Sequence, residues 1–340
     1  MYLQNCWYVA AWDHELGEAP LARRLLGRPV VLYRRRDGGP VALEDRCCHR
    51  SLPLSMGRVR GDNIQCGYHG LVFEPGGACI EVPGQTTIPP GARVRSYPVV
   101  ERHRWIWIWP GDPARADAAL IPELFWNDGP DWAVTGDYHH VNGDYRLMID
   151  VQMDATHVTY VHPDTLGSDS VQATPPKVER DGGRVRVDRW MIGVEPPKIW
   201  ALAGGFTGLV DRWILSSFEP PTGCLFDIGA AEAGTGAPEG DRSRGITNRT
   251  SHFVTPETER TCHYFWVFAR NYRIDDEGLS ERMKPGIHQT FREDVEVVEA
   301  QQRGIAEAAR PGRIDINADI TTIQSRRLLD SLIAAEARAA

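Results

Sequence analysis

The first 110 residues alternate between apolar and polar positions over short stretches, which is the period of half-buried β-strands. Two apolar runs, at 30–33 and 41–43, flank an Asp-Gly-Gly turn at 37–39, and this arrangement predicts a β-hairpin. A Pro-Gly-Asp-Pro run at 110–113 interrupts the pattern and marks the predicted domain boundary. We therefore expect a small all-β domain over residues 1–113.

The pattern changes in the rest of the chain. Residues 144–162 carry apolar side chains at helical spacing, and residues 177–275 return to strand patterns. Between these strands, residues 229–245 are rich in glycine and alanine, which predicts a disordered or mobile linker. Helical patterns cover 280–310 and 317–338. Strands followed by C-terminal helices predict an α+β fold for this second part.

A second domain over residues 114–340 is compatible with the chain length, since 340 residues suffice for two ordinary domains. The 42% hydrophobic and 25% charged residues are typical of a soluble globular protein, and the net charge of −8 gives no reason to expect nucleic acid or an anionic membrane as a partner. No apolar run is long enough to span a bilayer, and the first residues lack a secretory signal pattern. Seven cysteines without framework spacing indicate a reducing cytoplasm.

Two short motifs offer metal ligands from separate loops. The first contains Cys47 and His49 in a C-x-H pattern, and the second contains Cys66 and His69 in a C-x-x-H pattern. Thiolates and imidazoles bind zinc and iron–sulfur centres, but zinc fingers usually pair like with like on each knuckle. Mixed pairs suit a Rieske [2Fe–2S] cluster, in which one iron takes both cysteines and the other takes both histidines. A structural zinc site is the alternative.

A second candidate site lies in the predicted helix over 144–162. Asp154 and His157 are three residues apart and share a helix face, where they can form a hydrogen bond. His157 and His162 are five apart, so they can bind one ion only if the helix bends, which Pro163 favours. Two imidazoles and one carboxylate form the facial triad of non-haem Fe(II) oxygenases. Ordinary hydrogen-bonded histidines are the alternative, because this motif alone is weakly specific.

The third ligand is expected to be an acid buried at some cost. Asp294 falls within the apolar stripe of the predicted helix over 280–310, where an unpaired carboxylate is unfavourable. Its neighbours Glu293 and Glu296 point to other faces of that helix and are expected to be solvated. From the pattern alone, Asp294 is either the iron ligand or an ordinary surface acid.

With both sites in view, the chain resembles the oxygenase components of Rieske non-haem iron oxygenases, in the branch of vanillate O-demethylase, dicamba monooxygenase and toluenesulfonate methyl-monooxygenase. The resemblance runs nearly end to end and implies a Rieske domain followed by a helix-grip (START-like) catalytic domain with an antiparallel sheet. Besides the cluster loops, the segments that carry it are residues 5–10, 97–102, 107–113, 144–150, 255–258 and 293–294.

The resemblance also implies roles for particular residues. Cys47, His49, Cys66 and His69 match the cluster ligands, and the mononuclear iron ligands are matched by His157, His162 and Asp294. Asp154 matches an acid that connects the iron-bound histidine to the cluster histidine of a neighbouring subunit in a homotrimer.

Other positions depart from the family pattern or concern the substrate. Cys48 stands where relatives commonly carry proline, and Val151 stands where they often carry asparagine. His252 matches a position that binds the substrate acid in one relative, and Ile214 replaces an asparagine of that relative. Further candidates for the pocket are Arg212, Trp213 and the segment 200–210.

The implied reaction uses O2 and two electrons to hydroxylate the methyl or methoxy group of an aromatic acid, with a [2Fe–2S] cluster and mononuclear Fe(II) as cofactors. The chain has no Gly-rich dinucleotide fingerprint, so a separate NAD(P)H-dependent flavin/ferredoxin reductase is expected. Two alternatives are a ring-hydroxylating dioxygenase, which generally needs a longer chain and a second subunit, and a pure electron-transfer Rieske protein, which needs no second metal site.

Overall fold

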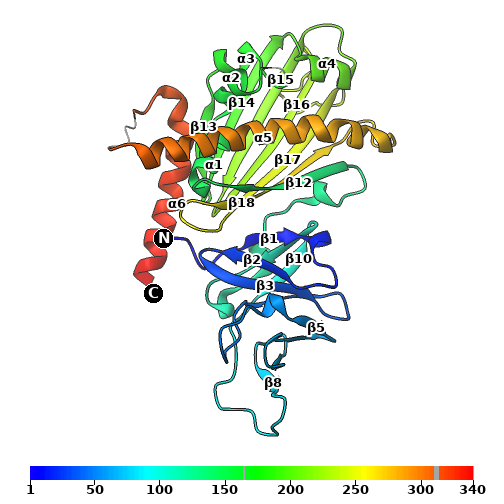
Figure 1. The fold of residues 1–340 in the computed structure, drawn as a ribbon. Helices are drawn as coiled ribbons and strands as arrows, with labels where there is room; N and C mark the ends of the chain where they lie inside the picture. The colour runs from blue at the N-terminus through cyan, green and yellow to red at the C-terminus, as the bar shows by residue number, and fades with distance from the viewer. Residues whose placement is uncertain (164, 310–313, 340) are drawn as a thin grey trace. The chain divides into compact units, whose positions relative to one another are not determined.

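The computed structural model describes residues 1–163, 165–309 and 314–339 and shows two compact units (Figure 1). Unit 1 comprises Met1–Glu123 with Thr255–Thr258, and unit 2 comprises Leu124–Val254 with Glu259–Ala340. Among the described residues, no helix combines the length and apolar character that crossing a membrane requires.

Unit 1 consists of three small antiparallel sheets, as the alternating pattern predicts. Their strand orders are β1-β11-β10, β2-β3-β4-β9 and β5-β6-β7-β8. The strands are β1 (Tyr8–Trp12), β2 (Leu21–Leu25), β3 (Arg28–Arg34), β4 (Pro40–Glu44), β5 (Arg58–Arg60), β6 (Asn63–Gln65), β7 (Val72–Phe73), β8 (Cys79–Glu81), β9 (Ser96–Tyr97), β10 (Val99–Arg102) and β11 (Trp105–Ile108).

The predicted hairpin is the β3–β4 pair, in which Tyr33 lies opposite Val41. Because successive strand residues point to opposite faces, β3 contributes to two apolar cores. Val30 and Leu32 belong to one core, while Val31 and Tyr33 belong to the core that also contains Cys47 and Cys66. The two cluster loops are therefore anchored in the second core of unit 1.

Unit 2 is an α+β domain with a seven-stranded antiparallel sheet in the order β12-β18-β17-β16-β15-β14-β13. The strands are β12 (Ala133–Val141), β13 (Lys177–Asp181), β14 (Arg184–Val194), β15 (Val210–Glu219), β16 (Gly223–Glu232), β17 (Gly245–Pro256) and β18 (Cys262–Arg270). The α-helices are α1 (Tyr145–Met153), α2 (Val158–Val161), α3 (Asp169–Ala173), α4 (Lys198–Gly204), α5 (Glu277–Glu307) and α6 (Ile320–Ala339).

The long helix α5 crosses one face of this sheet, and α1 lies beside it on the same face (Figure 1). The side of α5 that packs inward carries Ile287, Phe291, Val295 and Val298, which are buried and recur at intervals of three or four residues. Asp294 lies within this apolar stripe and is only 3% exposed. The sequence pattern therefore correctly identified an acid that faces the sheet.

The predicted linker over 229–245 is wrong at its ends, because β16 continues to Glu232 and β17 begins at Gly245, so that only 233–244 connect the two strands. The small residues there are required by packing: Gly229 lies opposite Trp213, and a Cβ on this glycine would meet the indole ring at 1.9 Å. The connection that follows is held by the Asp211 carboxylate, which accepts hydrogen bonds from the backbone N–H groups of Gly193 and Gly234 at 2.9 and 2.8 Å.

Candidate metal centres

The predicted continuous helix over 144–162 is broken where the chemistry lies. Helix α1 ends at Asp154, whose backbone is extended at φ −99° and ψ 98°, and a short 3-10 turn over Ala155–His157 leads into α2. His162 then leaves the helical region at φ −118° and ψ 49°. These two departures bring His157 and His162 together, with ring centroids 5.2 Å apart, although their sequence spacing would separate them on a straight helix.

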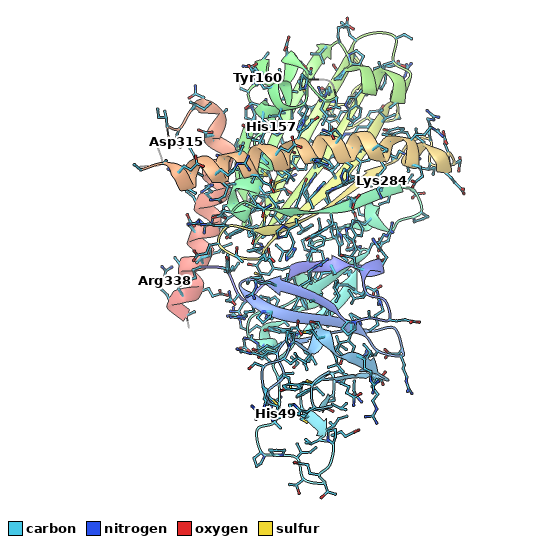
Figure 2. The ribbon with its side chains drawn as sticks, viewed as in Figure 1. His49, His157, Tyr160, Lys284, Asp315 and Arg338 are labelled. Atoms are coloured by element: carbon cyan, nitrogen blue, oxygen red, sulfur yellow. The ribbon has the colours of Figure 1, made fainter. Side chains whose placement is uncertain are left out.

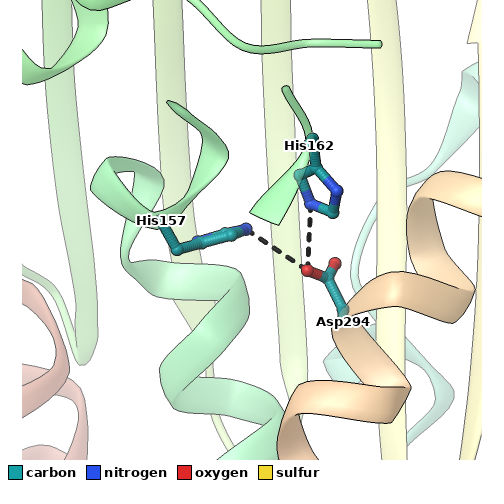
Figure 3. A group of neighbouring side chains, drawn as sticks. All are labelled: His157, His162 and Asp294. Atoms are coloured by element: carbon teal, nitrogen blue, oxygen red, sulfur yellow. Dashed lines mark ion pairs between the residues drawn. The ribbon is translucent and has the colours of Figure 1, made fainter. Parts of the chain in front are cut away.

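Asp294 of α5 completes the group (Figure 3). Its Oδ1 lies 3.3 Å from Nε2 of His157 and 3.0 Å from Nε2 of His162. The three ligand atoms all lie within 4.8 Å of one another. The sequence predicted these three side chains as a set, and the fold brings them to one point.

The hydrogen bonds around this group fit a metal ion. Buried Asp294 Oδ1 has no hydrogen-bond partner among the described residues, although both imidazoles face it. The atoms on the far side are all engaged: His157 Nδ1 contacts the carbonyl oxygen of Asp154, His162 Nδ1 lies 2.7 Å from Glu293 Oε2, and Gln152 Nε2 donates to Asp294 Oδ2 at 3.1 Å. In metal sites the ligand side chains are typically oriented by hydrogen bonds on the side away from the metal, while the atoms that face the metal have no other partner. Two nitrogens and one carboxylate oxygen match non-haem Fe(II).

The electrostatics of the site keep its carboxylate ionised. Burial would raise the pKa of Asp294, but the imidazoles of His157 and His162 that face its carboxylate lower it to about 2. Burial by itself would lower the pKa of His162. The interactions with Asp294 and Glu293 outweigh burial, so the pKa of His162 is raised overall. A cation at this point would replace the protons in balancing the two acids, so the charge of the site suits a divalent metal.

Two supporting residues were not found from the sequence. Glu293 was predicted to be solvated, and this is wrong: it is half-buried and binds His162, because that imidazole reaches the flank of α5 beside Asp294. Glu296 is exposed, as predicted, and pairs with Arg292 at 3.2 Å. Gln152 is buried on α1. The sequence offers only a weak signal for its role, which is an amide side chain two residues before Asp154.

Asp154 contacts His157 differently from the predicted side-chain hydrogen bond. The carbonyl oxygen of Asp154 is the atom that contacts His157 Nδ1, whereas its carboxylate accepts from the backbone N–H and the hydroxyl of Thr156 at 2.8 and 2.6 Å. The carboxylate is half-buried, so part of it is accessible. Its role towards a neighbouring subunit stays a prediction.

The cluster loops in unit 1 place their four candidate ligands in two environments. Cys47 and Cys66 are 2% and 3% exposed, whereas His49 and His69 are exposed. Figure 2 labels His49 among the loops of unit 1. The histidine rings lie close together, with centroids 4.6 Å apart. Burial, with a further contribution from Cys66, raises the pKa of Cys47 to about 11, so without a metal the Cys47 thiol would hold its proton. Cys48, which lies between two of these candidate ligands in the first loop, is exposed.

Both loops have the same backbone turn. In each, the cysteine N–H donates to the carbonyl of the leucine five residues later, and the cysteine carbonyl accepts from the residue four positions later, which has positive φ. The bonds are Cys47 to Leu52 at 2.8 Å, Ser51 to Cys47 at 2.9 Å, Cys66 to Leu71 at 2.8 Å and Gly70 to Cys66 at 3.1 Å. Equivalent turns present one thiol inward and one imidazole outward, which fits a cluster whose irons have different ligands.

Comparison with known families agrees with both sites. Residues 6–98 match the Rieske [2Fe-2S] domain, and residues 141–335 match the vanillate O-demethylase oxygenase C-terminal domain. The second match covers more than half of the chain and includes all three residues of the His-His-Asp site. The chain belongs to the vanillate O-demethylase oxygenase family. It is thus a Rieske non-haem iron monooxygenase, with a [2Fe–2S] domain and a site that matches mononuclear iron.

Individual relatives of this family align over nearly the whole chain. The chain is 45% identical to a toluene-4-sulfonate monooxygenase system iron-sulfur subunit from Comamonas testosteroni, over 99% of this chain and 98% of that one. It is 39% identical to a dicamba O-demethylase oxygenase component from Stenotrophomonas maltophilia, over 89% and 88%. A crystal structure of dicamba monooxygenase bound to 3,6 dichlorosalicylic acid superimposes with a TM-score of 0.91 at 36% identity, covering 99% of both chains.

The three candidate substrate residues of this oxygenase have different surroundings. His252 is 2% exposed, and its ring nitrogens already contact Tyr264 Oη at 2.6 Å and Thr250 Oγ1 at 3.1 Å. Burial lowers the pKa of His252 to about 3, so its ring is neutral. Ile214 is buried in an apolar cluster, and Val151 of α1 is half-buried. None of the three offers a free charged group to a ligand.

Proposed function

We propose that this oxygenase hydroxylates the methyl or methoxy carbon of an aromatic acid, using O2 and electrons from a separate reductase. The observation that carries the proposal is the triad of His157, His162 and Asp294 on a chain that also carries the Rieske loops. His162 and Asp294 are buried, and Oδ1 of Asp294 lacks a hydrogen-bond partner among the described residues. Bound Fe(II) would supply the activation of O2, with one oxygen atom entering the substrate C–H bond.

The residues of the chain hold and orient these groups. Cys47 and Cys66 would hold one iron of the cluster in the apolar core, and His49 and His69 would hold the other at the surface. In the second site, Glu293 orients the ring of His162 through Nδ1 so that Nε2 faces Asp294, and Gln152 fixes the carboxylate from behind. This division of labour assigns electron transfer to residues 1–113 and catalysis to residues 114–340.

The electron route is proposed to cross a subunit interface in a homotrimer. Asp154 would accept a hydrogen bond from His69 of the partner subunit while it stays next to His157. The exposure of His69 and the half-buried carboxylate of Asp154 support this assignment, because both groups remain accessible. A charge-assisted hydrogen bond of this kind is strong and orients both imidazoles. The electrons would come from a cytoplasmic NAD(P)H-dependent flavin/ferredoxin reductase.

The substrate class follows from the relatives. Toluene-4-sulfonate, vanillate and dicamba are aromatic acids that carry a methyl or methoxy group. Hydroxylation of a methoxy carbon gives a hemiacetal, which collapses to a phenol and formaldehyde. Hydroxylation of a methyl carbon stops at the benzylic alcohol. Both outcomes insert one oxygen atom into one C–H bond, so the same site can perform either.

The proposal is tested by iron analysis and product identification. The purified protein is expected to contain about three irons per chain, two in the cluster and one in the triad. With a suitable reductase, NADH and O2, methoxyarene acids should yield formaldehyde and methylarene acids should yield benzylic alcohols. A cis-dihydrodiol product would instead support a ring dioxygenase. Two irons per chain with no mononuclear metal at the histidines would leave only an electron-transfer protein and overturn the proposal.

A further inference from the structure

Arg212 on β15 is a buried cation with unused hydrogen-bond donors. Its side chain is 2% exposed, and its Nε and Nη1 atoms form no hydrogen bond with any residue that the structure describes. Burial alone lowers its pKa to about 10, with no neighbouring carboxylate to oppose the shift. An unpaired guanidinium inside a protein costs several kcal/mol, so its retention calls for a ligand.

The position of Arg212 in the sheet relates it to the iron site. Residues two apart on a strand, and residues opposite each other across a pair, share a sheet face. Arg212 therefore shares the face of Ile214 on its own strand and of Met191, its partner on β14. Ile214 and Met191 pack in one cluster with Val171, against Ala155, which lies between Asp154 and His157 in sequence. Two residues of a strand span about 7 Å, so Arg212 lies about 7 Å from Ile214, whose cluster packs against the turn that carries His157.

The opposite neighbours of Arg212 are also apolar. Ala230 on β16 lies across from it, and Val210 is the next residue of the same face. These two residues form a second cluster with Trp200, whose Nε1 is another buried donor without a partner among the described residues. The guanidinium therefore lies between two apolar clusters, and the indole N–H of Trp200 adds a second unused donor on the Val210 side.

Three other arginines of unit 2 each have at least one partner in the protein, although Nε of Arg189 and Nε of Arg270 form no hydrogen bond with the residues that the structure describes. Arg270 donates to the carbonyl oxygens of Tyr272, Arg273 and Asp276. Arg242 pairs with Asp227 at 2.7 Å and lies over the ring of Trp213, on the opposite sheet face from Arg212. Even Arg189, which shares the face of Ile214, donates to the carbonyl of Val171.

We propose that Arg212 binds the acid group of the substrate and thereby selects aryl sulfonates or carboxylates. The inference rests on the proposed function, because it concerns the same pocket. Both nitrogens of His252 are already engaged, so that histidine is not the charged anchor. Binding of the acid at Arg212 would point the opposite end of the ring, with its methyl or methoxy group, towards the side of Ile214 and the iron-bearing turn. A guanidinium suits this task because its fork can bind two oxygens at once.

The test measures binding without turnover. Iron-loaded protein without O2 or reductase is titrated in a calorimeter with toluene-4-sulfonate, 4-methylbenzoate and the uncharged toluene-4-sulfonamide. The variant Arg212→Met removes the charge but keeps much of the volume, and Arg242→Met is the matched control on the other face of the sheet. We expect Arg212→Met to weaken binding of its preferred anion about 100-fold and to change binding of the sulfonamide little. Arg242→Met should leave all three affinities unchanged.

A structural role for Arg212 would give a different result. Replacing an unpaired buried cation with methionine should keep or raise the thermal midpoint of the protein, whereas loss of a structural arginine would lower it. The proposal is overturned if Arg212→Met binds both anions as wild type does, if it loses the sulfonamide equally, or if the wild-type protein shows no preference for either anion over the sulfonamide. An anion that binds through Arg212 but is not hydroxylated would contradict the proposed function, while the role of Arg212 in binding the acid group would still hold.

Discussion

The two groups of metal-binding side chains differ in how the chain assembles them. In unit 1 each loop carries a cysteine and a histidine within four residues, and a local turn sets their directions. In unit 2 His157 and His162 depend on two breaks in a helix, and Asp294 comes from another helix more than a hundred residues later. Local turns define the first site, while tertiary packing defines the second.

The two sites also differ in how far they are exposed to solvent. The candidate cluster ligands are two buried thiols and two exposed imidazoles, so one side of that site is open to solvent. The His-His-Asp site is surrounded by further polar groups, with Glu293 and Gln152 holding the ligands from behind. An exposed site suits exchange of electrons with partners, and an enclosed site suits control over where a reacting ligand binds. Each difference can be tested by substitutions that affect one site and leave the other intact.

The largest effects are expected from removing one ligand at each site. Asp294→Ala should lower iron content by one atom per chain and leave the visible and EPR signals of the cluster unchanged. Cys66→Ser should abolish those cluster signals and leave the mononuclear site able to bind Fe(II). Both variants should lose turnover to background, because the reaction needs both centres. Iron analysis and EPR of the reduced protein provide the measurement, and loss of both metals in either variant would contradict the independence of the two sites.

Asp154→Asn tests the proposed connection between the sites. The substitution keeps an amide oxygen that can accept from Thr156 but removes the negative charge, so we expect both metals to stay bound while turnover falls on the order of 100-fold. Multiple-turnover rates with a fixed reductase, together with iron content, provide the measurement. Thr156→Val is the control, because it removes a hydrogen bond to the carboxylate and keeps the charge. Full activity of Asp154→Asn would refute the connecting role.

The sequence offered a complete set of candidate ligands for the local site and a partial account of the tertiary site. Cys47, His49, Cys66 and His69 could be identified because ligand type and spacing are visible within short motifs. Asp294 could be proposed because an acid in an apolar helical stripe needs a partner. The break at Asp154 could not be placed, because it depends on the hydrogen bonds of that residue with Thr156 and His157 rather than on a helix-breaking residue.

Two errors have the same physical origin. Residues 229–245 contain small side chains that usually indicate a loop, but here Gly229 is small because the ring of Trp213 occupies the space above it. Glu293 looks solvated on a helical wheel, yet His162 reaches it from another segment. In both cases a residue that is distant in sequence determines the environment of the side chain. The hydrophobic pattern within one element cannot reveal such a residue.

Glu293→Gln tests whether the His-His-Asp site depends on the residues that form hydrogen bonds with its ligands. Loss of the charge should weaken the orientation of His162 and lower Fe(II) affinity about 10-fold, with no change at the cluster. Glu296→Gln is a matched control one helical turn away, because that acid is exposed and pairs with Arg292 instead of a ligand of the His-His-Asp site. Competition between the protein and a chelator of known affinity provides the measurement. Equal affinities for the two variants would show that Glu293 does not support the site.

The smallest expected effect concerns the turn of the second cluster loop. Gly70 has φ +75°, and a Cβ there would meet Pro83 Cγ at 2.9 Å, whereas Gly91 has φ +77° with nothing within 4 Å. Alanine at either position should cost about 1 kcal/mol for the left-handed backbone, and Gly70→Ala should cost more because Pro83 must move. The temperature at which the cluster absorbance disappears should therefore fall further for Gly70→Ala than for Gly91→Ala. Equal midpoints would mean that the turn tolerates the contact and that local geometry alone does not define the cluster site.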